Sequence, residues 1–544
     1  MRISRAGLVG ACICIAAPAA QAQDRSDDPH IAAAPVITGN SGAIASAQTI
    51  QTLQSLPAAP QESADQIGAI VVIGNEAIED AQYQAAVEEF FGEPRNEEVL
   101  ARLTNQIAAL AREAGFPFVR ADIIDDANRF GVVQVMVDEG RVDEVRIEGY
   151  QNAQARRILN RFEGNVPNQR ELDRALLLVT DIPAVLLRGA RLKREDGRGI
   201  LFVELDQRDA SLRLNADNYG TEAFGPVRAV ASVRVNDALS SSDQVYAAVR
   251  INPIDLDELL YFSGSYETQL SVDGVTFGVD ASIGTTAPGG AFGDTDISGE
   301  SLSGGATLSA PVIRTRDASL WVDGRVSYIS IEQDDLGAML RDDTVVTAAI
   351  GLRTQWAVAG GRVRAGVSHV RGLGILGATR RGDALASRFD GDGVFSKIEF
   401  WSDARFPLAS RLDIYLSTGG QIADRPLLAS EEIALGGAYR TRGYDFSEVL
   451  GDEGVHGLIE LRYRFATTNL PLDFLQIYAF VDGGYVSDIG AGVGEGSLFS
   501  AGPGVRARIG PFDLELETGI PLGGSAETGD DNSPEVNLRA GVNF

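Results

Sequence analysis

The sequence predicts two small α+β modules followed by an all-β, 16-stranded transmembrane barrel. Three observations predict this fold class. Residues 67–208 hold two successive units with the same order of strand-like and helix-like patterns. From residue 209 to the end, helical periodicity gives way to runs of about ten alternating apolar and polar residues. The first 22 residues have the pattern of an export signal.

Residues 1–22 are expected to be a signal peptide. Two arginines precede an apolar stretch at 7–17, and small residues follow at the positions that a signal peptidase reads. A lipoprotein signal at Cys12 is the alternative, but almost no apolar segment precedes that cysteine. Both cysteines of the chain lie inside the signal, so cleavage after Ala22 would leave a mature chain without disulfides or thiolate metal sites.

Residues 23–66 form a linker rich in Ala, Ser, Gln and Pro, which favours irregular structure. Within it, apolar residues from Ile44 to Leu53 recur near helical spacing. This spacing predicts a short amphipathic helix inside the linker. A loosely ordered linker throughout is the alternative.

The first module covers residues 67–139. It should begin with a strand at 69–73 and a helix at 80–91, followed by a second helix that Asn96 caps and Gly115 ends. Two strands, at 118–124 and 131–137, then complete the unit, with a turn at 125–128. The module is therefore expected to contain one sheet covered by two helices.

The second module covers residues 140–208 and repeats the same order. A strand at 142–147 precedes a helix at 153–162 and a second helix that starts at Asn168. Strands at 184–193 and 199–205 follow, and Asp196-Gly197 between them is typical of a tight hairpin turn.

Residues 209–544 alternate too regularly for helices. In one late strand, Leu514 and Leu516 face one way while Glu515 and Glu517 face the other. We count about sixteen such strands, which suits a transmembrane barrel with short turns on one side and longer loops on the other. A secreted sandwich would also alternate. The export signal and the lack of a long apolar run favour the barrel.

The sequence offers little support for catalysis or cofactor binding. A net charge of -29 argues against nucleic-acid binding. The three histidines, His30, His369 and His456, are scattered, so neither a metal site nor a catalytic triad is expected. Gly372 to Gly377 matches the dinucleotide fingerprint by letter, but no helix follows it. We therefore expect a protein that is not an enzyme and needs no cofactor.

One loop of the barrel region is unusual in length and composition. Between strands near Gln421 and His456 lies the longest predicted loop, and it contains Arg442-Gly443-Tyr444 within a glycine-rich stretch. Glycines let a loop fold back tightly, and an arginine at its tip supplies a permanently charged fork. A charge of this kind inside a barrel needs a carboxylate partner.

The strand at Phe480-Val481-Asp482-Gly483-Gly484 offers that partner. On alternation, Phe480, Asp482 and Gly484 share one face. Asp482 should therefore point into the lumen. We predict that an Arg442–Asp482 pair locks the long loop inside the barrel.

These features together resemble the two-partner secretion transporters, the haemolysin and filamentous-haemagglutinin exporters. The resemblance rests on the signal, two POTRA-like modules, the barrel, Arg442-Gly443-Tyr444, Phe480-x-Asp482-x-Gly484 and the terminal Phe544. Where this family usually has a branched aliphatic residue before Arg-Gly-Tyr, this chain has Thr441. We expect that change to affect packing more than the ion pair.

The resemblance implies a location and a set of partners. The barrel would sit in outer-membrane lipid, and the modules would receive an unfolded, secreted exoprotein client in the periplasm. Family members carry an N-terminal plug helix, a role that the segment from Ile44 to Leu53 would fill. Phe544 would serve as the signal that the barrel assembly machinery recognises.

The expected function is thus a translocation pore that exports a partner protein without nucleotide hydrolysis. An outer-membrane insertase of the same superfamily is the alternative, although such proteins often carry more than two modules. A diffusion porin would leave residues 67–207 without a role. An outer-membrane lipase would need a Ser-His-Asp set that this sequence lacks.

Overall fold

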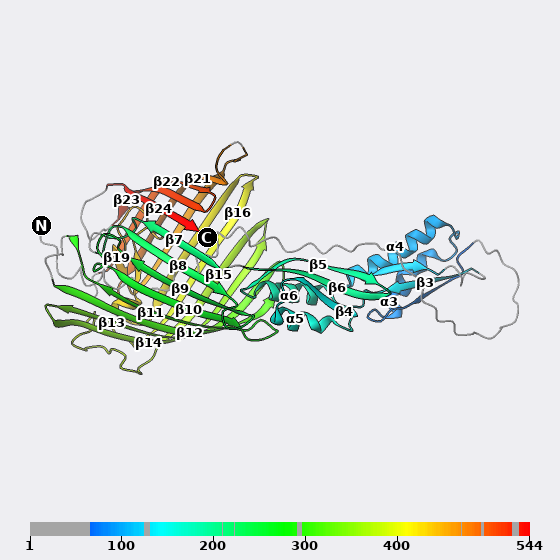
Figure 1. The fold of residues 1–544 in the computed structure, drawn as a ribbon, viewed down its shortest axis with the longest axis horizontal. Helices are drawn as coiled ribbons and strands as arrows, with labels where there is room; N and C mark the ends of the chain where they lie inside the picture. The colour runs from blue at the N-terminus through cyan, green and yellow to red at the C-terminus, as the bar shows by residue number, and fades with distance from the viewer. Residues whose placement is uncertain are drawn as a thin grey trace. The chain divides into compact units, whose positions relative to one another are not determined.

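A computed structural model describes residues 66–124, 131–208, 210–221, 224–290, 296–468, 470–490, 494–524 and 533–544. The predicted signal peptide, the linker helix and the turn at 125–128 lie outside these ranges. The described chain forms two compact units, one ending at Arg208 and the other, the barrel, following it (Figure 1). Within the described residues, no helix is long and apolar enough to cross a membrane.

The first module has the predicted elements in the predicted order. They are β1 (Ala69–Ile73), α3 (Asp80–Val87), a 3-10 turn (Glu88–Phe90), α4 (Glu97–Glu113), β2 (Arg120–Ile123) and β3 (Val132–Asp138). Asn96 caps α4, since its side chain accepts a hydrogen bond from Val99 N at 2.9 Å. Strand β3 lies in the middle of the sheet, parallel to β1 and antiparallel to β2. Strand β2 is therefore an edge strand.

The core of this module lies between α4 and the sheet. Leu103 and Ile107 of α4 are fully buried with Val133 and Val135 of β3. Buried Glu139 fixes the segment after β1, because its carboxylate accepts hydrogen bonds from three successive backbone N–H groups and from the Tyr83 hydroxyl. Burial and this carboxylate raise the pKa of Tyr83 well above its usual range.

The second module repeats the topology of the first. Its elements are β4 (Glu144–Gly149), α5 (Ala153–Leu159), a 3-10 turn (Asn160–Phe162), α6 (Gln169–Thr180), β5 (Val185–Glu195) and β6 (Arg198–Gln207). The strand order β4-β6-β5 matches that of the first module. The hairpin turn is as predicted, since Asp196 and Gly197 both have positive φ, at 51° and 78°. The repeat that the sequence predicted is thus confirmed.

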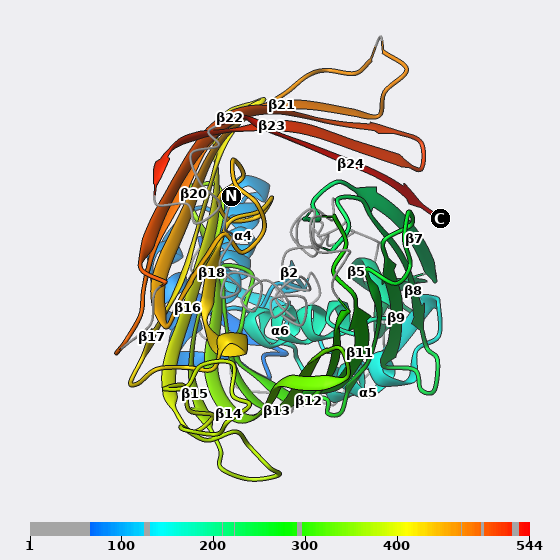
Figure 2. The same ribbon diagram turned by 90° about the vertical axis from the view of Figure 1, so that its left-hand side faces the viewer.

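The barrel closes with sixteen antiparallel strands, as predicted (Figure 2). The strands are β7 (Ser211–Asp217), β8 (Arg228–Asn236), β9 (Asp243–Ile251), β10 (Leu260–Gln269), β11 (Thr276–Thr286), β12 (Ile297–Arg314), β13 (Ala318–Asp335), β14 (Ala338–Val358), β15 (Gly361–Gly372), β16 (Ser396–Ala409), β17 (Leu412–Ala423), β20 (Glu453–Arg464), β21 (Phe474–Ser487), β22 (Gly496–Ile509), β23 (Phe512–Gly524) and β24 (Glu535–Asn543). Strand β24 pairs with β7, and Phe544 exchanges two backbone hydrogen bonds with Leu212 at that seam.

Successive side chains of each barrel strand point alternately to the outer and the inner face of the wall, as predicted. On β23, Glu515 and Glu517 are 8% and 3% exposed, whereas Leu514 and Leu516 are 46% and 45% exposed. The apolar residues therefore face outward, where lipid would lie, and the carboxylates face the lumen.

The connections differ in length between the two ends of the barrel. At the end where β7 begins, many turns are short, such as 359–360 and 410–411. At the other end lie the long connections, and we call 373–395 loop 5, 424–452 loop 6 and 488–495 loop 7. Loop 6 holds a 3-10 turn (Ala429–Glu431) and a hairpin of β18 (Ile433–Leu435) and β19 (Val449–Gly451). It is the long loop that the sequence predicted.

Candidate functional site: a loop locked inside the barrel

The hairpin of loop 6 folds back onto the inner wall. Leu435 of β18 and Val449 of β19 are buried with Val486 of β21 and Leu498 of β22. Directly after β18 the chain turns back at Gly436 and Gly437, whose φ values are 107° and 89°. Only glycine adopts such angles without strain, which accounts for the glycine pair at this turn.

The Arg442 guanidinium is buried against three carboxylates. Its Nη2 lies 2.6 Å from Glu460 Oε1 on β20, and its Nη1 lies 3.0 Å from Glu517 Oε2 on β23. Its Nε lies 3.7 Å from Asp482 Oδ2 on β21 and has no hydrogen-bond acceptor among the described residues. The guanidinium carbon also stands 4.4 Å from the centre of the Phe480 ring.

The predicted Arg442–Asp482 contact is therefore present but is the longest of the three. Asp482 also holds the backbone of the loop, because its Oδ2 accepts a hydrogen bond from Arg442 N at 3.4 Å. Its other oxygen, Oδ1, accepts a hydrogen bond from the Ser500 hydroxyl on the neighbouring strand. Sequence reasoning missed Glu460 and undervalued Glu517 as partners of Arg442. Both face the lumen by alternation, but alternation alone does not reveal which carboxylates the loop tip reaches.

Glu460 is the centre of a wider charge network. It is fully buried, and its Oε2 contacts Arg462 Nε at 2.6 Å and Arg506 Nη1 at 3.3 Å, in addition to Arg442. Three arginines thus share one carboxylate. A buried charge cluster of this kind keeps each member oriented, because moving one leaves the others without compensation.

Gly443 and Tyr444 complete the contact of the loop tip with the wall. Gly443 N donates to Ser500 Oγ at 3.1 Å, and a Cβ there would lie only 2.9 Å from Ser500 Cβ and from Pro521 N. The Tyr444 hydroxyl donates to the carbonyl oxygens of Phe499 and Gly523, at 3.2 and 3.0 Å. All three residues of the motif therefore touch the barrel wall.

The wall face that the sequence singled out meets loop 6 directly. Phe480 and Asp482 are each 3% exposed, and Phe480 lies under the guanidinium. A Cβ at Gly484 would lie 2.6 Å from Leu435 Cδ2 of the loop. The structure thus brings Phe480, Asp482 and Gly484 together with the loop tip, while Phe544 lies apart from them at the seam.

Thr441, where the resembling family has a branched aliphatic residue, is fully buried. Its hydroxyl has no hydrogen-bond partner among the described residues. Thr441 therefore leaves a buried hydroxyl unsatisfied at a position where a branched aliphatic residue would have no polar group to satisfy.

A second ionic group holds loops 5, 6 and 7 together, and we call it the loop clasp. Arg388 of loop 5 contacts Glu432 of loop 6 at 2.5 Å, Asp452 at 2.9 Å and Asp488 of loop 7 at 3.5 Å. The three carboxylates could also surround a metal ion, because their oxygens lie within 4.8 Å of one another. Since Arg388 contacts all three, the arginine itself supplies the positive charge.

The loop clasp should depend on pH. Burial raises the pKa of Glu432 to about 7 from its ordinary 4.5, although Arg388 opposes the shift, and burial also raises the pKa of Asp452. The closed clasp therefore binds more protons than the open one. Its stability should be highest below about pH 4.5 and fall as pH rises through about 7, by roughly 3 kcal/mol.

Hydrogen exchange of loops 5 to 7, measured from pH 5 to pH 8, tests this dependence. Protection should decrease with rising pH, and Glu432→Gln should flatten the profile, because glutamine keeps a hydrogen-bonding oxygen but does not titrate. The matched control, Asp424→Asn, should leave the profile intact, because burial raises the pKa of Asp424 less than its hydrogen bonds from Arg425 and Ser396 N lower it. Protection that rises with pH would contradict the assignment.

Two protein-family models match this sequence. The model for "Haemolysin secretion/activation protein ShlB/FhaC/HecB" matches residues 200–507, and that for "POTRA domain, ShlB-type" matches residues 66–140. The heme/hemopexin transporter protein HuxB of Haemophilus influenzae is 21% identical over 399 residues, which cover 71% of this chain and 69% of HuxB. The outer membrane transporter CdiB of Dickeya dadantii is 22% identical over 407 residues, covering 72% and 71%.

Solved structures share the fold. CdiB from Escherichia coli has a TM-score of 0.73 at 19% identity, with both chains covered completely. BamA from Haemophilus ducreyi lacking POTRA domains 1–3 has a TM-score of 0.52 at 14% identity, covering 88% of this chain and all of that one. The predicted location, a barrel in the outer membrane with the modules in the periplasm, is confirmed by the family matches. The family model alone spans more than half of the sequence, and the chain belongs to the haemolysin secretion/activation protein ShlB/FhaC/HecB family.

Proposed function

We propose that this outer-membrane transporter captures an unfolded partner exoprotein on its periplasmic modules and passes it through the barrel lumen to the outside. No nucleotide is hydrolysed, and no covalent chemistry is carried out on the client. The observation that carries this proposal is the free edge of β2 beside an open groove, because an extended chain needs such an edge to bind.

Strand β2 can accept a further strand. Among the described residues β2 pairs with β3 alone, and Ile124 N donates to Gln134 O on that side at 3.0 Å. Since backbone donors alternate along a strand, the N–H groups of Ala121 and Ile123 point toward the free edge. An extended client segment could hydrogen-bond there irrespective of most of its sequence, as β-strand addition does elsewhere.

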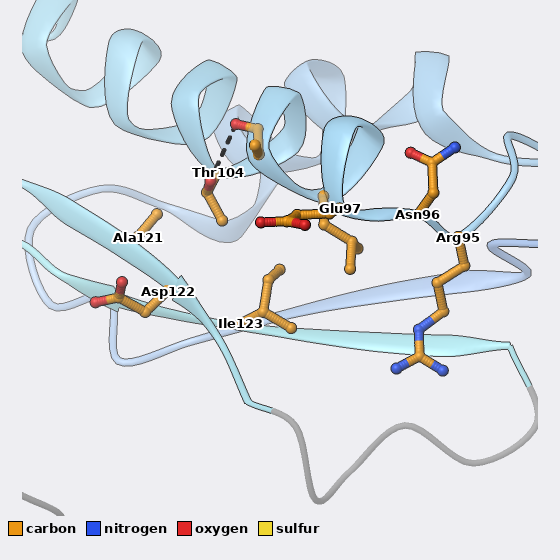
Figure 3. A pocket seen from close by; sticks show the side chains of 9 residues that line it. Arg95, Asn96, Glu97, Thr104, Ala121, Asp122 and Ile123 are labelled. Carbon is orange, nitrogen blue, oxygen red and sulfur yellow. Dashed lines mark hydrogen bonds between the residues drawn. The ribbon is translucent and has the colours of Figure 1, made fainter.

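A groove between β2 and α4 lies along this edge (Figure 3). Its volume is about 450 Å³, and it is lined by Arg95, Asn96, Glu97, Leu100, Ala101, Thr104, Ala121, Asp122 and Ile123. Leu100, Ala121 and Ile123 make its floor apolar, whereas Arg95, Glu97 and Asp122 supply charges at its rim. Apolar client side chains could enter the groove while the client backbone pairs with β2.

Loop 6 then acts as a gate in the lumen. We propose that Arg442, Gly443 and Tyr444 hold it against the face formed by Phe480, Asp482 and Gly484, and that the client displaces it during export. Phe544, with its side chain 67% exposed beside the seam, is proposed as the signal that the barrel assembly machinery reads. The outward apolar residues of the strands contact membrane lipid.

Quantitative mass spectrometry of culture medium, cell surface and outer membrane, with and without this gene, tests the function. Loss of one or two large exoproteins with other barrels unchanged is the expected result, and it would identify the client. A broad fall in many outer-membrane barrels would instead support the insertase alternative and contradict the export proposal.

A further inference from the structure

Two neighbouring strands of the barrel present arginines but no carboxylates to the lumen. On β8, Val233 and Val235 are 40% and 37% exposed on the outer face, so Arg234 between them points inward. On β9, Arg250 is paired with Val230 of β8 and shares this inward face. The single carboxylate of the two strands, Asp243, accepts backbone N–H groups of the adjoining turn.

Both arginines are held by aromatic rings instead of carboxylates. The Arg234 guanidinium lies 5.9 Å from the centre of the Tyr246 ring, and that of Arg250 lies 5.8 Å from Tyr261. Neither Arg234 nor Arg250 has an ion-pair partner within the part of the chain that the structure describes, whereas Arg228, the third arginine of the two strands, pairs with Asp217 of β7 at 2.8 Å. Stacking on a ring orients a guanidinium yet leaves its N–H edge free to bind an anion.

Other arginines of the lumen have carboxylate partners. Arg442, Arg462 and Arg506 all contact Glu460, and Arg539 contacts Glu515 at 2.7 Å, so these positive charges are already neutralised. In the view along the barrel, β8 and β9 lie at the right of the ring, β20 lies at the left, and β21 and β22 lie at the top (Figure 2). Arg234 and Arg250 differ from these arginines because they have no carboxylate partner among the described residues, in a protein whose net charge is -29.

We propose that Arg234 and Arg250 form a docking strip for acidic, unfolded segments of the transported polypeptide. The inference rests on the proposed function and adds the chemical class of the client: a chain enriched in Asp and Glu. A guanidinium binds a carboxylate through two parallel hydrogen bonds, and a partly desolvated lumen strengthens that contact. Several weak contacts in succession hold a chain without trapping it, as conduction requires.

Fluorescence anisotropy with the full chain in detergent tests the strip. The probe is a labelled, unstructured peptide of Glu, Gly and Ser. We expect it to bind in spite of the protein's negative charge, and the double variant Arg234→Gln/Arg250→Gln to weaken binding about tenfold. Arg234→Lys/Arg250→Lys should retain most of the affinity, because the positive charge remains.

The matched control is Arg380→Gln/Arg381→Gln, which removes the same charge from the exposed part of loop 5. It should leave peptide binding unchanged, and the heat-modifiable gel mobility of all variants should show folded barrels. No binding by the wild type, or an equal loss in the control, would overturn the docking strip. The export proposal would still stand if deleting the gene removed an exoprotein from the medium, so the two failures are distinguishable.

Discussion

Replacing Arg442 by alanine should reduce export of the client by at least about tenfold while the barrel still inserts, since releasing a buried ion pair costs roughly 3–5 kcal/mol. The substitution should release loop 6 from the wall, because Arg442 is the residue of this loop that contacts Glu460, Glu517 and Asp482. The wall should remain intact. After the substitution, Glu460 still contacts Arg462 and Arg506.

Removing the two carboxylates that lie at different distances from Arg442 should reduce export to different extents. Glu460→Gln should impair export more than Asp482→Asn, since Arg442 lies 2.6 Å from Glu460 and 3.7 Å from Asp482. Client in the medium, quantified by mass spectrometry, is the readout.

Arg364→Ala is the control for the contact of Arg442 with Glu460, Glu517 and Asp482, which holds loop 6 against the wall. Arg364 is also a lumen-facing arginine with a carboxylate partner, Asp403 at 2.8 Å. Their pair joins β15 to β16 and makes no ion pair with loop 6 among the described residues. Export should stay near the wild-type level in this variant. Equal losses in Arg364→Ala and Arg442→Ala, or normal export in both Arg442→Ala and Glu460→Gln, would refute a specific lock.

Ala121→Pro should have the second largest effect, a loss of client capture and of export by about tenfold, through the edge of β2. Proline removes the N–H that points toward the free edge and places a ring there, yet takes no hydrogen bond from the β2–β3 ladder. Co-purification of client with the full-length protein, together with export, measures the change.

Ala121→Ser is the matched control, since serine keeps both the backbone donor and a similar volume. It should bind and export client normally, and thermal unfolding should show that both variants keep a folded first module. If Ala121→Pro captures client as well as Ala121→Ser does, the client binds somewhere other than this edge.

The fold followed closely from the sequence because its signals are local. A repeated order of capped helices and short strands predicted both modules, and strict alternation after residue 209 predicted the barrel. Alternation also predicted that Asp482 and Glu517 face the lumen, where both are buried. Strand ends moved by a few residues, as with β2, because turns and propensity mark boundaries only loosely.

The site depended on contacts that no local pattern encodes. Glu460 lies 18 residues from Arg442 and Glu517 lies 75 residues away, and both meet its guanidinium because neighbouring strands and the folded loop bring them to one height in the lumen. The loop clasp joins three loops in the same way. By itself the sequence determined the two modules, the barrel and which face each strand residue takes, since periodicity is a property of the chain. Only the tertiary structure decided which charges meet, because strand stagger and loop path depend on packing between segments distant in sequence.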